Sequence, residues 1–228
     1  MTIQQRASLL AKKLAEIYPK AHCELVYNNP LELLAATILS AQCTDVRVNK
    51  VTPLLFKRCP SVADYALISQ EELEKIIHST GFFRSKAASL RRCAATLIEK
   101  HEGHVPQSLK ELAALPGVGR KTANVVLSNA FGINEGIVVD THVKRLSNRF
   151  GLTKEHDPVK IECDLIKLFS RKTWGDFSHW LVWHGRRRCY ARKPDCKACE
   201  LRELCPSVDR PDRFKKNGDG SEKINVRA

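Results

Sequence analysis

The end of the chain holds four of its nine cysteines in the pattern Cys189-x6-Cys196-x2-Cys199-x5-Cys205. In a reducing compartment, thiolates this crowded repel one another and oxidise unless a cation holds them, so the pattern predicts a metal site that organises this segment. Structural zinc sites usually join two separate Cys-x2-Cys pairs. This segment has one such pair between unequal gaps, which favours an iron–sulfur centre, although the spacing alone leaves zinc open.

The other cysteines predict no disulfide framework, because the cysteine count is odd and the chain shows no signal peptide pattern. They stand singly in helical patterns, where a cysteine is normally a small buried hydrophobe. No apolar run approaches the ~20 residues that span a bilayer, so we expect an intracellular protein without a membrane partner. The side chains expected to be buried are Cys23, Cys43, Cys59, Cys93 and Cys163.

The chain carries a formal net charge of +13 and has a pI near 9.5, which indicates a polyanionic partner. Residues 207–228 contain six basic and four acidic side chains, so a charge of +11 belongs to the folded body. A basic tail therefore does not explain the excess. The alternative is a surface whose charge serves solubility alone.

Apolar residues recur at helical period through most of the chain, and we expect an all-α protein of about ten helices. Asn29-Pro30 is typical of a helix start, with a capping residue followed by proline at the first helical position. Ser69 with Glu72 matches the capping box of a second helix. Further helices are predicted from a cap at Ser85 to about His101, from Asp157 to Phe169, and from Trp174 to about Arg187.

The two ends of the chain differ in their patterns. Residues 1–15 are basic, amphipathic and free of acids, as transit peptides are, but apolar residues from Leu10 to Ile17 recur on one helical face and favour a plain helix. Residues 208–228 lack such a face, and we expect a disordered tail there. The best strand candidate, residues 136–139, is only four residues long.

A glycine-rich turn, Leu115-Pro-Gly-Val-Gly-Arg-Lys-Thr-Ala123, joins two helical patterns. Gly117 and Gly119 permit unusual backbone angles, so that consecutive amide hydrogens point outward at the start of the second helix. A helix–hairpin–helix of this kind binds a DNA phosphate through backbone donors, without reading the base sequence. The alternative is an ordinary Pro-Gly connection, but the adjacent Arg120 and the basic chain favour phosphate binding.

Basic residues are dense around the four cysteines. A loop that a metal stiffens and that carries guanidinium groups is suited to phosphate contacts, and we expect Arg187, Arg192 and Lys193 to contact DNA. The alternative is that these charges partly neutralise an anionic four-thiolate site, and the two roles are compatible. The basic residues in this region are Arg186, Arg187, Arg188, Arg192, Lys193 and Lys197, opposed locally by Asp195.

The segment Val138-Val-Asp-Thr-His-Val-Lys-Arg145 places an acid at the expected start of a helix. Asp140 fits the N-cap position, a role worth ~1 kcal/mol. From this segment alone, capping is a stronger interpretation of Asp140 than catalysis.

Taken together and in this order, these motifs resemble the endonuclease III family of bacterial DNA glycosylases, which carry a helix–hairpin–helix and a [4Fe–4S] cluster. The resemblance rests on LPGVGRKTA, VDTHV, the cysteine pattern and Leu39-Ser-Ala-Gln-Cys-Thr-Asp45, and it covers roughly residues 1–207. It implies two helical domains flanking a DNA-binding groove. These are a six-helix domain at 23–134, with the hairpin at 115–121, and an iron–sulfur cluster domain made of 1–22 plus 135–207.

The resemblance implies a base excision repair enzyme that acts on oxidised pyrimidines in damaged double-stranded DNA, as a glycosylase and as an abasic-site lyase. It makes Lys121 the nucleophile and Asp140 the catalytic carboxylate. A lysine must attack the sugar C1′ as a neutral amine, so another group has to accept its proton. The resemblance also implies a [4Fe–4S] cluster on the four cysteines, a monomer, and a cytoplasmic, nucleoid-associated location in a bacterium.

Attack at C1′ requires the damaged nucleotide to leave the base stack, and the vacated space must be filled. By the resemblance, Gln42, Phe82 and His142 are the side chains that fill it, with an aromatic residue at 82 where the family has an aliphatic one. Alternatively, Gln42 is a polar group at a helix end and Phe82 a core residue. Asp45 is carried over as a groove residue of low catalytic importance.

Two other functions stay open. A non-catalytic DNA-binding or redox-sensing module predicts salt-dependent DNA affinity without strand scission. A monofunctional relative, such as the adenine glycosylase of A·G mismatches, lacks a lysine at position 121 and carries an extra C-terminal domain. The presence of both Lys121 and Asp140 favours the bifunctional enzyme.

Overall fold

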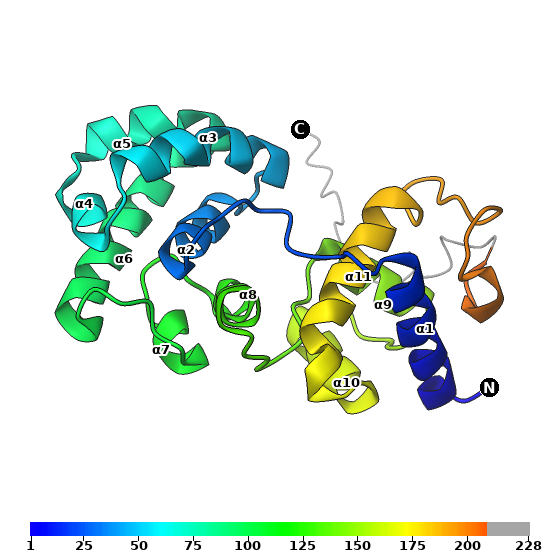
Figure 1. Ribbon diagram of the computed structural model, residues 1–228. Helices are drawn as coiled ribbons and strands as arrows, with labels where there is room; N and C mark the ends of the chain where they lie inside the picture. The colour runs from blue at the N-terminus through cyan, green and yellow to red at the C-terminus, as the bar shows by residue number, and fades with distance from the viewer. Residues whose placement is uncertain (209–228) are drawn as a thin grey trace, which may run out of the picture. The chain divides into compact units, whose positions relative to one another are not determined.

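The computed structural model describes residues 1–208 (Figure 1), and every regular element within them is a helix, which confirms the all-α prediction. The chain folds as two compact units. Unit 1 comprises Met1–Pro19, Val139–Phe169 and the described part of Trp180–Ala228. Unit 2 comprises Lys20–Val138 and Ser170–His179.

The helices are distributed over both units. Unit 2 contains α2 (Pro30–Leu39), α3 (Asp45–Arg58), α4 (Val62–Leu67), α5 (Gln70–Ile77), the 3-10 helix η1 (His78–Thr80), α6 (Phe83–His101), α7 (Leu109–Ala113), α8 (Arg120–Phe131) and the 3-10 helix η2 (Arg171–Thr173). Unit 1 contains α1 (Ile3–Ile17), α9 (Thr141–Arg149), α10 (Pro158–Leu168) and the 3-10 helix η3 (Arg202–Leu204). Helix α11 (Trp174–Arg187) begins in unit 2 and continues into unit 1. The segment 136–139 forms no strand.

Helix α2 is the centre of the core of unit 2. All of its residues from Leu33 to Leu39 are buried, and it packs against α3, α6 and α8 (Figure 1). A helix that is apolar on every side is stable only when other helices cover it. Asn29 caps the helix as expected, with 2.9 Å between its Oδ1 and the backbone nitrogen of Glu32. This buried helix fixes the position of the turn that carries Gln42.

Two predicted helix starts in unit 2 need correction. Ser69 caps α5 as expected, but the Glu72 carboxylate pairs with Arg58 instead of completing a capping box. The predicted cap at Ser85 is wrong, because α6 begins before that residue. Phe82 precedes α6 in the left-handed conformation and offers no side-chain cap, while the Ser85 hydroxyl donates back to the Phe82 carbonyl inside the first turn.

The N-terminal helix α1 forms part of the core of unit 1. Leu10 and Leu14 are fully buried on one face of α1, where it packs against α10 and η3, so the predicted plain helix is confirmed. Asp157 caps α10 as expected, by accepting hydrogen bonds from the backbone of Val159 and Lys160.

The single cysteines differ in burial. Cys59 and Cys93 are buried as expected, whereas Cys23 and Cys43 are only half-buried. The prediction for Cys163 is wrong, because this side chain is exposed. It lies two residues from the buried Ile161 and Leu165, and therefore on the opposite face of α10.

The expected six-helix domain at 23–134 falls within unit 2, which also takes in Ser170–His179. The assignment of 1–22 plus 135–207 to a cluster domain stays a prediction. Apart from Val208, the expected tail at 208–228 lies outside the described residues. Among the residues that the structure describes, no helix is long and apolar enough to cross a membrane.

Candidate functional site

The glycine-rich turn of unit 2 joins α7 to α8, and two of its own apolar side chains are buried in the core. Leu115 and Val118 are 3% and 5% exposed, so the core anchors the turn. Gly117 has φ +78°, and a Cβ there would lie 2.7 Å from the Cβ of Ser89 on α6. Gly119 is the N-cap of α8 and supplies no side-chain acceptor for the first amides of that helix. The turn therefore presents helix-start amides that an anion can accept from.

The candidate nucleophile lies directly after this turn. Arg120 and Lys121 are the first two residues of α8, and both side chains are exposed. Ala123 and Asn124 on the same helix are buried, which leaves the amine of Lys121 on the solvent side of the helix start. The turn and the candidate nucleophile are thus adjacent in one continuous segment of unit 2.

Asp140 is the N-cap of α9 in unit 1. Its Oδ1 accepts a hydrogen bond from the backbone nitrogen of Val143 at 2.7 Å, which confirms the capping role. The bond uses one carboxylate oxygen, so the other retains its lone pairs for a second partner. Because Lys121 belongs to unit 2 and Asp140 to unit 1, their catalytic pairing stays a prediction.

His142 follows in the first turn of α9 and is held by two residues that the sequence analysis missed. Its Nδ1 lies 3.1 Å from Nη2 of Arg145, which also donates to the carbonyls of Gly185 and Cys189. A Cβ at Gly185 would lie 2.6 Å from the same Nδ1, so only glycine fits there. Glycine in the interior of α11 was the available signal, because it costs helix stability unless packing requires it. Burial lowers the pKa of Arg145.

Gln42 and Phe82 lie in two turns of unit 2. Both are exposed, and both adopt positive φ angles, of 53° and 47°. Phe82 is 64% exposed, so the core-residue alternative is excluded. Asp45 is the first residue of α3 and half-buried, directly after the N-cap Thr44. The roles of Gln42, Phe82 and Asp45 in DNA binding stay predictions.

The four clustered cysteines of unit 1 line a single cavity. Cys189, Cys196, Cys199 and Cys205 surround it together with apolar side chains such as Phe150. Within the described part of the chain, no three or more His, Cys, Asp or Glu side chains are arranged to hold a metal ion. Four thiols around one cavity are a ligand set that both zinc and iron–sulfur centres use.

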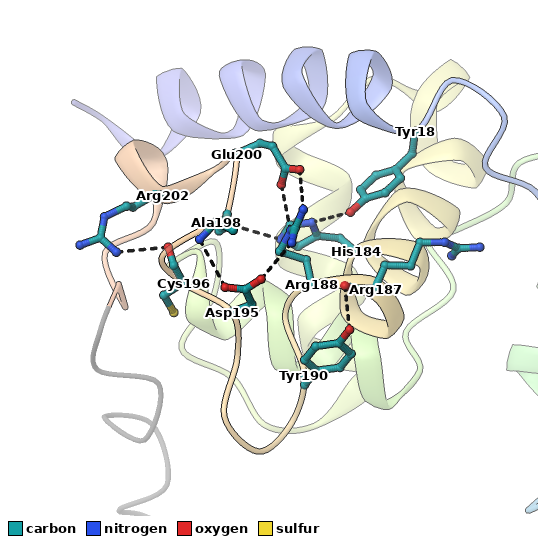
Figure 2. A network of polar contacts seen from close by, with 11 residues as sticks. Tyr18, His184, Arg187, Arg188, Tyr190, Asp195, Cys196, Ala198, Glu200 and Arg202 are labelled. Atoms are coloured by element: carbon teal, nitrogen blue, oxygen red, sulfur yellow. Dashed lines mark hydrogen bonds and ion pairs between the residues drawn. The ribbon is translucent and has the colours of Figure 1, made fainter.

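Buried polar side chains contact these thiols. Arg149, 5% exposed, donates to Sγ of Cys189 at 3.2 Å and to the next two carbonyls along the chain. His184 is fully buried, with Nε2 3.6 Å from Sγ of Cys199 and Nδ1 3.0 Å from the Tyr18 hydroxyl. Figure 2 shows Tyr18 and His184 in this contact. Arg149 and His184 were missed, because only the fold brings them to the cysteine segment.

Burial determines the protonation of this site. It raises the pKa of Cys205 to about 11 and also raises the pKa of Cys199, so both thiols are neutral without a metal. It lowers the pKa of His184 to about 4, so the imidazole is neutral. Because a metal binds thiolates, its binding must displace the thiol protons.

Two of the basic residues near the cysteines have structural contacts. Arg188 pairs with Asp195 at 2.9 Å and with Glu200 at 3.0 Å (Figure 2), and these carboxylates raise the pKa of Arg188. Arg187 is exposed and lies over the ring of Trp183, 3.9 Å from its centroid. Through these two ion pairs, Arg188 links the start of the cysteine segment to Asp195 and Glu200 within it.

Two other basic residues face solvent. Arg192 and Lys193 are exposed, and Lys193 has φ 51°. Arg187, Arg192 and Lys193 are thus all accessible from solvent, and their contacts with phosphates stay predictions.

Comparisons with known proteins place these features in one family. Residues 35–171 match the HhH-GPD superfamily base excision DNA repair protein. The chain is 54% identical over 205 residues to Endonuclease III of Synechocystis sp., which covers 90% of this chain and 94% of that protein. It is 40% identical over 212 residues to Endonuclease III of Escherichia coli strain K12, which covers 93% of this chain and 100% of that protein. A non-covalent endonuclease III–DNA complex matches with a TM-score of 0.88 at 43% identity, covering 93% of this chain and 100% of that one. A trapped endonuclease III–DNA covalent intermediate matches with the same values.

Proposed function

The chain belongs to the endonuclease III family, within the HhH-GPD superfamily of base excision DNA repair proteins, and on that premise we propose that it is a bifunctional enzyme. As a glycosylase it removes oxidised pyrimidines such as thymine glycol from double-stranded DNA. As a lyase it cuts the strand at the resulting abasic site. The position of Lys121 carries the proposal, because an exposed amine directly follows the turn that offers backbone amides to a phosphate.

In the glycosylase step, Nζ of Lys121 forms a bond to C1′ as the bond from C1′ to the base breaks. The electron pair of the broken bond leaves with the base. The amine has to give up a proton as its bond to C1′ forms, and Asp140 is the carboxylate proposed to accept it and to stabilise the positive charge that develops on the sugar. The capping bond of Asp140 occupies one oxygen, which orients the carboxylate and leaves the other for this task.

In the lyase step, the C1′–O4′ bond breaks and O4′ takes up a proton, while the nitrogen lone pair turns the nitrogen–C1′ bond into a protonated Schiff base. This cation acidifies the hydrogen on C2′. When a proton acceptor takes that hydrogen, its electron pair forms a C2′–C3′ double bond, and the 3′ phosphate leaves with the electron pair of the C3′–oxygen bond. Water then hydrolyses the Schiff base and releases Lys121.

Three groups of residues are proposed to contact DNA, each in a different way. The amides after Gly117 and Gly119, with Arg120, hold a phosphate and set the register of the duplex. Arg187, Arg192 and Lys193 add charge–phosphate contacts. Gln42, Phe82 and His142 fill the space that the extruded nucleotide leaves.

The four clustered cysteines are proposed to hold a [4Fe–4S] cluster as thiolates. All four cysteines line one cavity, as the ligands of one cluster must. A cluster supplies no step of the reaction; when bound, it cross-links the segment from Cys189 to Cys205. Arg149 and His184 then direct donors at two of the sulfurs, which offsets part of their negative charge.

Borohydride trapping tests the proposal. With a thymine-glycol duplex, reduction converts the Schiff base into a stable covalent complex that migrates more slowly on a denaturing gel. Lys121→Ala is expected to abolish trapping, whereas Lys110→Ala, an exposed lysine on α7, is the matched control and should leave it intact. Trapping that survives in Lys121→Ala contradicts the assignment. Binding of the duplex by wild-type protein with neither trapping nor strand scission instead supports a non-catalytic DNA-binding module.

A further inference from the structure

The two exposed residues expected to enter DNA from unit 2 share an unusual backbone. Gln42 and Phe82 both adopt positive φ angles, which residues other than glycine adopt only at a cost in free energy. Such a conformation persists where the surrounding structure enforces it. Something in unit 2 must therefore hold both turns.

Lys86, on the first turns of α6, contacts both turns at once. The side chain is 5% exposed, and its Nζ donates to the carbonyl of Leu39 at 2.8 Å and to the carbonyl of Thr80 at 2.8 Å. Leu39 is the last residue of α2, and Thr80 is the last residue of η1. Gln42 and Phe82 follow these carbonyls by three and two residues. One ammonium group thus binds the backbone two or three residues before each strained residue.

An ammonium group is a costly way to fill this buried position. Within residues 1–208 Lys86 pairs with no carboxylate, and burial lowers its pKa while nearby Cys43 raises it. A methionine would fill a similar volume without burying charge. Unlike methionine, the ammonium provides two donors, and these point at the ends of two helices. The last carbonyls of a helix have no partners within that helix, so they can accept these hydrogen bonds.

The same helix also supports the phosphate-binding turn. Ser89 lies three residues after Lys86, on the same side of α6, and its Cβ occupies the space that a side chain at Gly117 would need. Helix α6 therefore contacts both the segments that lead to Gln42 and Phe82 and the turn that leads to Lys121.

We propose that Lys86 is a positioning residue for base extrusion: its buried ammonium joins the ends of α2 and η1, and so holds Gln42 and Phe82 in place to enter the duplex. This inference rests on the proposed function, since it assigns Gln42 and Phe82 to the space of the extruded nucleotide. Preorganised side chains meet the duplex without a further ordering cost, and small misplacements of such groups reduce rates strongly.

The test compares Lys86→Met with wild type on two substrates. Excision of thymine glycol from a duplex requires extrusion and is expected to slow by on the order of tenfold to a hundredfold. Strand cleavage at a preformed abasic site in single-stranded DNA requires no extrusion and is expected to change less than about twofold. Equal losses on both substrates overturn the proposal, because they indicate a general structural defect.

Thr80→Val is the matched control for stability. The Thr80 hydroxyl donates to the carbonyl of Ile77 at 2.8 Å, so this substitution removes a buried hydrogen bond from the same 3-10 helix but leaves both carbonyls that Lys86 binds. Thr80→Val is expected to lower the melting temperature with little change in duplex excision. A loss of excision as large as that of Lys86→Met overturns the proposal. If Lys86→Met does not fold, Lys86→Gln serves in its place, and Lys86→Arg, which keeps the charge, should retain more excision than either.

Insertion is also measured without catalysis. The fluorescence of 2-aminopurine placed opposite a tetrahydrofuran abasic analogue reports the unstacking that Gln42 and Phe82 cause, and Lys86→Met should lower the amplitude of the change. In a Gln42→Ala, Phe82→Ala background, Lys86→Met should cause no further loss, whereas additive losses contradict the proposal. A wild-type protein that changes the fluorescence but cuts neither substrate refutes the proposed catalytic function and leaves this insertion measurement to decide on Lys86.

Discussion

The carboxylate of Asp140 accepts a hydrogen bond from the backbone nitrogen of Val143, with 2.7 Å between Oδ1 and N. This bond makes Asp140 the N-cap of α9, while the proposed function assigns the same residue to catalysis. The two roles depend on different properties. Capping needs an acceptor oxygen, whereas accepting a proton needs a charged carboxylate.

Asp140→Asn should separate these two roles. Asparagine caps helices about as well as aspartate, so the free energy of unfolding should change by less than about 0.5 kcal/mol, whereas Asp140→Ala should cost about 1 kcal/mol. Single-turnover excision of thymine glycol should fall by about a hundredfold or more in both variants, since both lose the proton acceptor. Chemical denaturation and single-turnover kinetics measure the two effects. Retention of full excision by Asp140→Asn would show that the residue only caps.

Gly117→Ala should destabilise the turn before α8. The added Cβ would lie 2.7 Å from the Cβ of Ser89, and alanine resists the φ of +78°. We expect the free energy of unfolding to fall by about 1–3 kcal/mol, with weaker binding of undamaged duplex. Gly119→Ala is the control, because no atom lies within 4 Å of a Cβ there and its φ is −91°. Equal stability losses in Gly117→Ala and Gly119→Ala argue against a steric cause.

The stability of unit 2 should fall at alkaline pH. Burial raises the pKa of Cys93 from 9.0 to about 12, so between these values the unfolded chain releases a proton that the folded chain keeps. The contribution is complete below pH 9 and decreases as pH rises toward 12, by up to ~1.4 kcal/mol per pH unit. Cys93→Ala should therefore show a shallower decline of unfolding free energy with pH than wild type. The exposed Cys163→Ala should decline as wild type does, and identical slopes in all three proteins would exclude the effect.

Helix starts were predictable where the signal is local. Asn29 and Asp157 cap their helices as expected, because an N-cap bond joins residues only two or three positions apart. The Ser85 prediction failed because α6 begins two residues earlier, at Phe83. Phe82 precedes the helix in the left-handed conformation, and a pattern of capping side chains does not reveal that backbone geometry.

Candidate site residues were predictable to the extent that a motif carries them. Lys121 and the four clustered cysteines stand in recognisable patterns, and the cysteines do line one cavity. Arg149, His184 and Gly185 escaped detection, although each contacts a candidate site residue. None of the three stands in a recognisable motif, because an arginine, a histidine or a glycine on a helix has many ordinary explanations.

The amino-acid sequence by itself determined the all-α class, most helix boundaries, the positive charge and the identity of the motifs, because these depend on the order and spacing of nearby residues. Only the tertiary structure decided that one ammonium binds the ends of two helices and that Arg149 contacts Cys189. It also showed that the capping bond of Asp140 uses one carboxylate oxygen and leaves the second oxygen out of that bond. A buried donor must find an acceptor wherever the packed chain places one, and that partner is set by the fold rather than by its distance along the sequence.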